Sequence, residues 1–187
     1  MSATVLEAGP GTVADPAPAP ASVDPAAFRA AMAALAAPVT VVTCFDEDGA
    51  PRGLTASAVA SLSLDPPLFL VCLDKRSSTH DVLAGAPSFR VNLMGPGNER
   101  LALQFAGPAR DRFAGLRPGQ GPAPVLDGAA LSLSCEHHGV RDGGDHTILI
   151  GRVTAITGAA DGACAAAGGL LWHQRGFAHA TPVPPSS

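Results

Sequence analysis

The sequence predicts a mainly β domain with helical caps, in the form of an antiparallel β-barrel. Short runs of β-branched and apolar residues recur along the chain, and Gly, Pro, Asp and Asn separate them. The two longest runs, 130–140 and 146–157, are joined by the turn-forming residues RDGGD, as in a β-hairpin. Helical spacing of apolar residues is confined to short stretches. About six strands with two or three short helices are typical of a barrel with helices at its ends.

The composition favours one globular domain. The chain has 187 residues, of which 47% are hydrophobic and 15% are charged, so it can bury a sizeable core. The formal net charge of −4 argues against nucleic acid as a partner. The longest apolar runs, such as LFLVCL, are too short to cross a bilayer. We therefore expect neither nucleic acid nor a membrane as a partner.

The cysteines point to a reducing compartment. Cys44, Cys72, Cys135 and Cys164 are not spaced as metal ligands or as redox pairs. Three of them lie in apolar strand-like runs, where a buried free thiol is expected. The N-terminus has no basic start followed by an apolar segment, so no secretion signal is expected. Together these features predict a cytoplasmic location.

Both ends of the chain are expected to lack regular structure. Residues 1–23 are rich in Ala, Pro and Gly, and proline at this density excludes a helix or a central strand. Residues 181–187, TPVPPSS, form a second and shorter tail. We therefore predict a disordered tail over 1–23, one domain over 24–180, and a flexible C-terminal tail.

The first structured element is expected to be a helix over residues 24–37, DPAAFRAAMAALAA. Asp24 is placed as the N-cap and Pro25 occupies the first helical position, where its missing N–H costs nothing. Pro38 should end the helix. Two further short helices are expected over 77–85 and 97–106. In the second of these, Leu101, Leu103 and Phe105 are expected to face the core.

The strands follow from β-branched and apolar runs between turn signals. DEDG supplies a hairpin turn, DPP a second turn, and a Gly/Pro-rich loop, LRPGQGPAPVL, crosses the surface. The expected strands are residues 39–45, 53–64, 68–74, 88–94, 130–140 and 146–157, with 170–179 as a last strand or edge.

The stretch after the strand 68–74 is a candidate anion site. Two cations are followed by hydroxyl side chains at the start of the expected helix 77–85, and helix starts offer backbone N–H groups to anions. The residues concerned are Asp74, Lys75, Arg76, Ser77, Ser78 and Thr79. The alternative is simple helix capping by Ser78, with Asp81 at the third position. The spacing leaves both interpretations open.

Other polar residues give weaker signals. The hydroxyls between Thr55 and Ser63 could face a polar ligand, but small side chains packed against a helix would give the same pattern. His137 and His138 are adjacent, so in a strand they point to opposite faces and cannot share a metal. The sequence contains no Ser-His-Asp order, no usefully paired carboxylates and no zinc pattern.

The order of these stretches resembles one known family. The stretches occur in this order: PVTVVTCFDEDGAPRGLTASAVASLSLDPPLFLVCLDKRSSTHDVL, then FRVNLM, the pair QFAG and DRFAG, LDGAALSLSC, and finally GDHTILIGRV. This arrangement resembles the flavin reductase-like, FMN-binding split-barrel family, whose members are reductase partners of two-component flavin monooxygenases. The resemblance covers about residues 26–180. It implies that the barrel is an antiparallel split β-barrel.

The resemblance also implies a set of flavin-binding residues. Main-chain and hydroxyl groups of Thr55, Ala56 and Ser57 would hold the flavin ring. The segment from Leu73 to Thr79 would receive the ring edge, ribityl chain and phosphate, in agreement with the anion site above. The residues implied in that segment are Leu73, Asp74, Lys75, Ser77, Ser78 and Thr79. The same cleft would be lined by Pro38, Thr40, Ser61, Val91 and Asn92.

His146, in the GDH motif, would lie beside the nicotinamide when it stacks on the flavin; the alternative is a histidine that merely caps a hairpin. The family resemblance implies an NAD(P)H:flavin oxidoreductase, with FMN or FAD as the flavin and NADH or NADPH as the hydride donor. It also implies a homodimer that supplies reduced flavin to a separate monooxygenase. A non-enzymatic flavin carrier that retains FMN needs the same ring cradle and stays open. In a barrel protein that binds a small ligand other than flavin, the predicted anion site would have no function.

Two positions depart from the family pattern. Arg90, in FRVNLM, stands where the family usually has a small or apolar residue, so the outer face of that strand is in question. Trp172 stands where a tyrosine is common, which bears on how the C-terminal edge closes the site.

Overall fold

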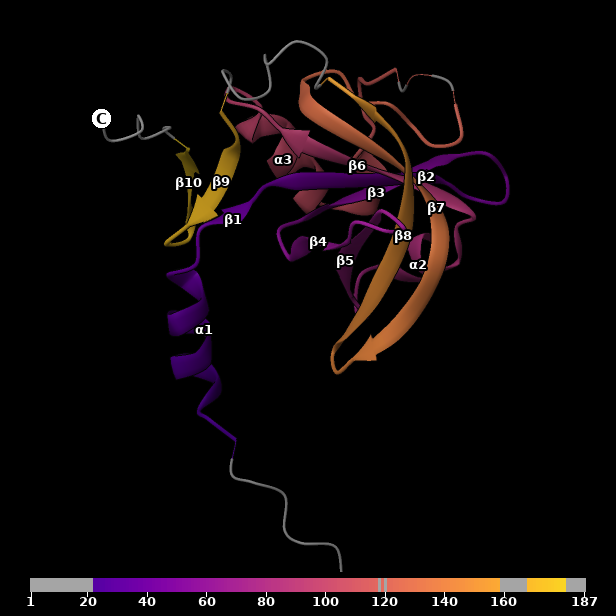
Figure 1. Cartoon of the computed structure of the whole chain (residues 1–187). Coiled ribbons are helices and arrows are strands. Elements are labelled where there is room, and N and C mark those ends of the chain that lie inside the picture. The colour runs from indigo at the N-terminus through magenta and orange to yellow at the C-terminus, as the bar shows by residue number, and fades with distance from the viewer. Residues whose placement is uncertain (1–21, 118, 120, 159–167, 181–187) are drawn as a thin grey trace, which may run out of the picture. The chain divides into compact units, whose positions relative to one another are not determined.

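A computed structural model describes residues 22–117, 119, 121–158 and 168–180. The chain divides into a first unit that ends at Met32 and a second unit that starts at Ala33. The first unit contains most of helix α1, Pro25–Ala33, and the second contains every described strand (Figure 1). Apart from residues 22 and 23, the predicted tails and Cys164 lie outside the described residues.

Helix α1 begins as expected and ends earlier. The Asp24 carboxylate accepts a hydrogen bond from the backbone N–H of Ala27 at 2.8 Å, so Asp24 is the N-cap. The helix ends at Ala33, not at residue 37, because Ala37–Pro38 form strand β1 and pair with strand β9 (Leu170–His173). The extended backbone that this pairing requires excludes a helix up to Pro38.

The second unit consists mainly of antiparallel strands, as predicted. Two short α-helices, α2 (His80–Gly85) and α3 (Glu99–Ala106), and the 3₁₀ helix η1 (Ala109–Asp111) accompany them. The strands are β1 (Ala37–Pro38), β2 (Thr40–Phe45), β3 (Pro51–Ala56), β4 (Val59–Ser63), β5 (Leu68–Asp74), β6 (Ser88–Met94), β7 (Ala129–Gly143), β8 (His146–Thr157), β9 (Leu170–His173) and β10 (Gly176–His179).

The main sheet curves back on itself. Its strand order is β3-β2-β6-β7-β8-β5-β4, so the two edge strands are neighbours in the sequence. Ser57 and Ala58 alone connect them, and a link of this length spans at most about 11 Å. The edges therefore have to lie close together, although no backbone pairing joins β3 to β4 in the described chain. The result is an open, or split, barrel.

The predicted strand 53–64 is wrong as a single element. It is divided into β3 and β4, and the break falls at Ser57 and Ala58. The carbonyl of Ala58 accepts a hydrogen bond from the N–H of Cys72 at 2.9 Å, so the chain has crossed to β5 at this point. Loose alternation in the sequence does not reveal this change of neighbour.

The remaining strands agree closely with the sequence. β5 and β6 coincide with the predicted runs, and β8 coincides with 146–157. The predicted last strand, 170–179, is a tight hairpin of β9 and β10, with positive φ at Gln174 and Arg175. β1 completes this second, three-stranded sheet (Figure 1). No described helix is long and apolar enough to span a membrane.

Helix α3 presents a narrower apolar face than expected. Ala102 and Phe105 are buried, and Leu101 packs against the core beside them. Leu103 is 57% exposed, so its predicted place in the core is wrong. At about 100° per residue, Leu103 lies about 200° around the helix from Leu101 and so faces the other way.

The barrel interior is packed closely around one glycine of β8. A Cβ atom at Gly151 would collide with the Phe89 ring and would lie 2.7 Å from the Cβ of Cys135. Both neighbours are buried and belong to the main hydrophobic core. This position therefore has no room for a side chain.

We predict that Gly151→Ala lowers the free energy of unfolding by about 1–3 kcal/mol, because the extra methyl group overpacks the core. Urea denaturation followed by circular dichroism measures the change. Gly169→Ala is the matched control, since nothing lies within 4 Å of a Cβ there. Equal stability of the two variants would contradict the packing argument.

Candidate functional site

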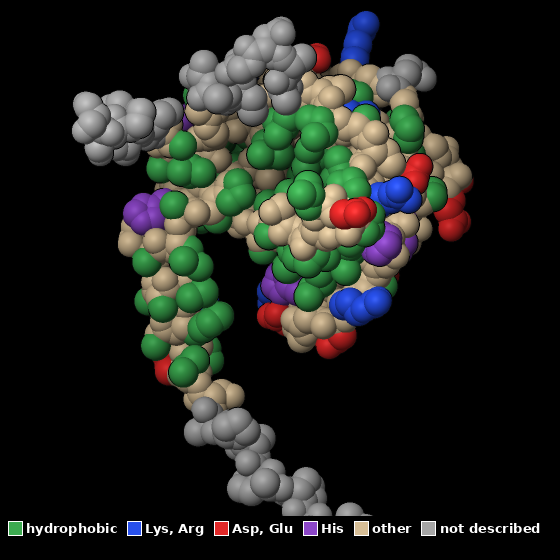
Figure 2. Space-filling view, in the orientation of Figure 1, with side chains coloured by type: hydrophobic (Ala, Val, Ile, Leu, Met, Phe, Trp, Pro, Cys, Tyr) green, Lys and Arg blue, Asp and Glu red, His purple; other side chains and the backbone are tan. Residues whose placement is uncertain are grey.

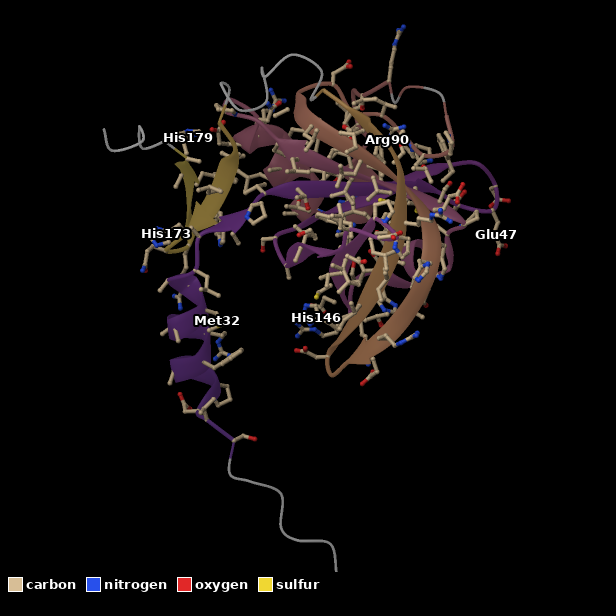
Figure 3. All side chains as sticks on the ribbon, in the orientation of Figure 1. Met32, Glu47, Arg90, His146, His173 and His179 are labelled. Carbon is tan, nitrogen blue, oxygen red and sulfur yellow. The ribbon has the colours of Figure 1, made fainter. Side chains whose placement is uncertain are left out.

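His146 lies at the tip of the long β7–β8 hairpin. It is the first residue of β8 and its Cα pairs with that of Asp74, the last residue of β5. Its side chain is 38% exposed, and Nδ1 lies 2.7 Å from the Asp145 carboxylate. Figure 3 shows His146 at this tip. The imidazole is therefore held on one side and accessible to a ligand.

Lys75 fastens the hairpin tip to the end of β5. Its Nζ donates to the Asp142 carboxylate at 2.5 Å and to the Gly144 carbonyl at 2.6 Å. Its backbone N–H donates to the carbonyl of Asp145 at 3.1 Å. The hydrogen bond from Lys75 lowers the pKa of Asp142. Lys75 is thus part of the structure that positions His146.

The second cation of the predicted anion site is also paired. Arg76 donates from Nη2 and Nε to the Asp74 carboxylate at 2.9 and 3.1 Å, and its side chain is 83% exposed. These hydrogen bonds lower the pKa of Asp74 to about 2. Figure 2 shows charged side chains and histidine gathered around the hairpin tip. Both cations of the predicted anion site, Lys75 and Arg76, are therefore already paired with carboxylates.

The hydroxyl residues that follow have different environments. Ser78 is exposed, and the Ser77 hydroxyl accepts from the N–H of Thr79 at 3.3 Å. Thr79 is the N-cap of α2 and makes no side-chain cap hydrogen bond. The alternative interpretation, capping by Ser78, is therefore wrong, because the helix begins one residue later than that alternative requires.

Arg112 connects the two segments that the family resemblance assigns to flavin. It is 9% exposed, and its Nη1 donates to the Gly53 carbonyl of β3 at 2.8 Å and to the Thr79 hydroxyl at 2.7 Å. Its Nε donates to the carbonyl of Gly107 at 3.0 Å. Sequence reasoning assigned no role to this residue, although it lies in the quoted DRFAG stretch. One buried guanidinium thus fixes β3 against the residues before α2.

An apolar pocket lies at the end of β3. It has a volume of about 190 Å³. Trp172 and Phe177 form one wall as an edge-to-face pair with ring centroids 5.2 Å apart. The Ser57 side chain is exposed here, whereas the Thr55 hydroxyl donates to the carbonyl of Ala102 at 2.6 Å. The lining residues are Val39, Thr55, Ser57, Ala102, Leu103, Ala106, Trp172 and Phe177.

Several predicted cleft residues are buried instead. Thr40, Leu73, Val91 and Asn92 have no exposed surface. The Thr40 hydroxyl donates to the Ala56 carbonyl at 2.6 Å, and the Asn92 amide donates to the Val41 carbonyl at 3.0 Å. The prediction that Thr40, Val91 and Asn92 line the flavin cleft therefore does not hold for their side chains, which lie inside the barrel. The side chain of Leu73, predicted as the first residue of the flavin-receiving segment, is buried in the core.

Two of the other predicted positions are accessible. Pro38 is half-buried in β1, opposite Leu171, and Ser61 is exposed on β4. Ala56 is nearly buried, so its main chain is the part available to a ligand.

His80 is a further polar residue beside the tip that sequence reasoning missed. Its Nε2 lies 2.8 Å from the hydroxyl of Thr147, the residue after His146. Its Nδ1 lies 2.7 Å from the Asp81 carboxylate. The described residues contain no group of three or more His, Cys, Asp or Glu side chains that could hold a metal ion.

Residues 32–181 match the family model described as Flavin reductase like domain. The chain belongs to this family. The chain is 40% identical over 174 residues to the NADH:riboflavin 5'-phosphate oxidoreductase of Streptomyces pristinaespiralis, over 90% of this chain and 96% of that protein. The flavin reductase-like resemblance read from the sequence is therefore confirmed.

The chain is also similar to a longer protein and to a solved structure. A Rhizobium meliloti protein named Probable flavin reductase is 42% identical over 135 residues, which is 71% of this chain and 43% of that protein. The chain thus spans less than half the length of this relative. The solved Streptomyces globisporus NADH:FAD oxidoreductase, in complex with NAD and FAD fragments, is 33% identical with a TM-score of 0.77. That match covers 88% of this chain and 99% of the solved one.

We predict that Arg112→Met lowers the free energy of unfolding by about 2–4 kcal/mol, because buried acceptors on Gly53 and Thr79 lose their donor. Chemical denaturation measures the loss. Arg110→Met, at a side chain that is 86% exposed, is the control. If both variants are equally stable, Arg112 does not hold the two segments together.

Proposed function

We propose that this flavin reductase-like chain is an NAD(P)H:flavin oxidoreductase that transfers a hydride from NADH to FMN or FAD. The observation that carries the proposal is the half-exposed His146, set by the β5–β8 register opposite Asp74 and next to the segment 73–79. A dinucleotide bound at the hairpin tip would thus lie beside a flavin bound along that segment.

The residues fit a flavin. The aromatic and aliphatic walls around Ser57 suit a flat apolar ring, and the main chain of Thr55 to Ser57 supplies polar groups at its edge. The exposed hydroxyls of Ser61 and Ser78 are free to contact more polar parts of the ligand. Lys75 and Arg76 directly precede Ser77 and Ser78 in the sequence. To bind a phosphate there, each cation would leave its carboxylate partner, which is Asp142 for Lys75 and Asp74 for Arg76.

The role of the chain in this reaction is to position the flavin and the dinucleotide relative to each other. When bound, the flavin accepts at N5 the hydride that the reduced nicotinamide donates. Such a transfer needs little help from a general acid or base, so no catalytic triad is required. His146 orients the dinucleotide, Arg112 holds β3 against the residues before α2, and backbone N–H groups stabilise negative charge at the ring edge.

The partners follow from the same proposal. Reduced flavin leaves for a separate flavin-dependent monooxygenase, and a second copy of the chain completes a homodimer. Support for a homodimer comes from β4, an edge strand with apolar side chains in solvent: Leu62 is 46% exposed, and Leu64, just beyond its end, is 92% exposed. The free thiols of Cys44, Cys72 and Cys135 support a cytoplasmic location.

We predict steady NADH oxidation by the purified full chain when free FMN or FAD is added, followed by the loss of nicotinamide absorbance. NADH should be used in preference to NADPH. A chain that binds FMN but oxidises neither dinucleotide above the rate without protein would be a flavin carrier, and the enzyme proposal would fail.

We predict that His146→Ala raises KM for NADH several-fold, since one or two hydrogen bonds of about 0.5–1.5 kcal/mol each are lost. Flavin affinity and thermal stability should change little. His138→Ala, at an exposed residue of β7, is the control. Lower stability with unchanged NADH kinetics would mean that His146 only caps the hairpin.

We predict that Lys75→Met weakens FMN binding about 10–150-fold and leaves riboflavin binding nearly unchanged, because a charge-assisted bond to phosphate contributes about 1.5–3 kcal/mol. Asp142→Asn breaks the same ion pair but keeps the cation, so it should not weaken FMN binding. Fluorescence titration gives both affinities. Equal losses for both flavins in both variants would assign Lys75 to the hairpin tip alone.

A further inference from the structure

Arg90 is a buried cation without a counter-ion. It lies in β6 with its Cα opposite Thr43 of β2 and Ser134 of β7, on the face of the sheet away from the core residue Val91. It is 7% exposed, and its Nε has no hydrogen-bond partner. Among the described residues, no carboxylate forms an ion pair with it.

A pocket of about 510 Å³ lies against Arg90. One wall is a loop that two hydroxyls fasten to the sheet: Ser88 donates to the Pro122 carbonyl at 2.7 Å and Thr43 to the Pro124 carbonyl at 2.8 Å. The pocket is therefore preformed. Its lining residues are Pro87, Ser88, Phe89, Arg90, Pro122, Ala123, Ser134, Cys135, Glu136, His137 and Thr154.

No ion pair among the described residues offsets the charge of Arg90, although Glu136 lines the same pocket. Burial lowers the pKa of Arg90, as expected for a cation removed from water. Burial also raises the pKa of Cys135 to about 12, so this thiol is neutral at physiological pH and supplies no negative charge. A buried charge without a partner is strongly unfavourable, and a bound anion would relieve it.

We propose that this pocket binds a small organic monocarboxylate, with Arg90 as its anchor. The planar guanidinium of Arg90 lines the pocket, matches the geometry of a carboxylate, and has no carboxylate partner among the described residues. Phe89, Pro122 and Ala123 suit an apolar body attached to the carboxylate. Glu136 also lines the pocket and repels a second negative charge, which disfavours phosphate.

This site is separate from the candidate flavin site. Figure 3 shows Arg90 well apart from His146, and the two pockets have no lining residue in common. The proposal does not depend on the flavin reductase activity, so its test uses binding and not turnover.

Isothermal titration of the full chain with benzoate tests the proposal, with inorganic phosphate as the second probe. We expect one saturable benzoate site and at least tenfold weaker binding of phosphate. Arg90→Met should weaken benzoate binding at least tenfold, whereas Arg110→Met, at an exposed arginine, should leave it unchanged.

A second variant guards against misfolding of Arg90→Met. Ser134→Leu fills the pocket opposite Arg90 and keeps the guanidinium, so it should also abolish benzoate binding. Absence of saturable benzoate binding, tighter binding of phosphate, or unchanged benzoate binding in both pocket variants would overturn the proposal.

Discussion

The link of two residues between β3 and β4 is the constraint on which the barrel depends. Ser57 and Ala58 join the two edges of a seven-stranded sheet, so the sheet cannot lie flat. The curvature of the sheet encloses the core of Val42, Val91 and Leu149. The same link carries Ser57 into the apolar pocket, so the residues that curve the sheet also form part of the candidate site.

Local patterns in the sequence were sufficient for strands that clear turn signals delimit. β5 and β6 coincide with the predicted runs, because each is a short run containing several apolar residues with turn-forming residues before and after it. The end of α1 was missed because it depends on the pairing of β1 with the distant strand β9, and the break at Ser57 was missed because the chain changes its pairing partner there from β2 to β5. Leu103 differs from the prediction for another reason: it is apolar but lies on the side of α3 that faces away from the core.

The site residues could be predicted as a region, but their individual roles could not. The sequence shows that a strand contains a hydroxyl or amide side chain, but it does not show whether that side chain faces a ligand or a neighbouring carbonyl. Thr40 and Asn92 are engaged with carbonyl groups inside the barrel, and Lys75 with a carboxylate 67 positions away. Arg112 acts by the same kind of long-range contact, which no local spacing indicates.

The two parts of the candidate site are held with different strength. Arg112 is buried, and loss of its hydrogen bonds would leave unsatisfied acceptors inside the protein, so β3 and Thr79 stay fixed. The Lys75–Asp142 pair at the hairpin tip is solvent-accessible, with side chains 40% and 78% exposed. Such pairs contribute about 0–1 kcal/mol, so the tip is held mainly by the backbone pairing of β8 with β5 and β7, which extends to His146. A wall fixed by a buried guanidinium thus stands beside a solvent-exposed hairpin tip, and this arrangement suits the two ligands of the proposed reaction, because the exposed side stays open to the one that exchanges.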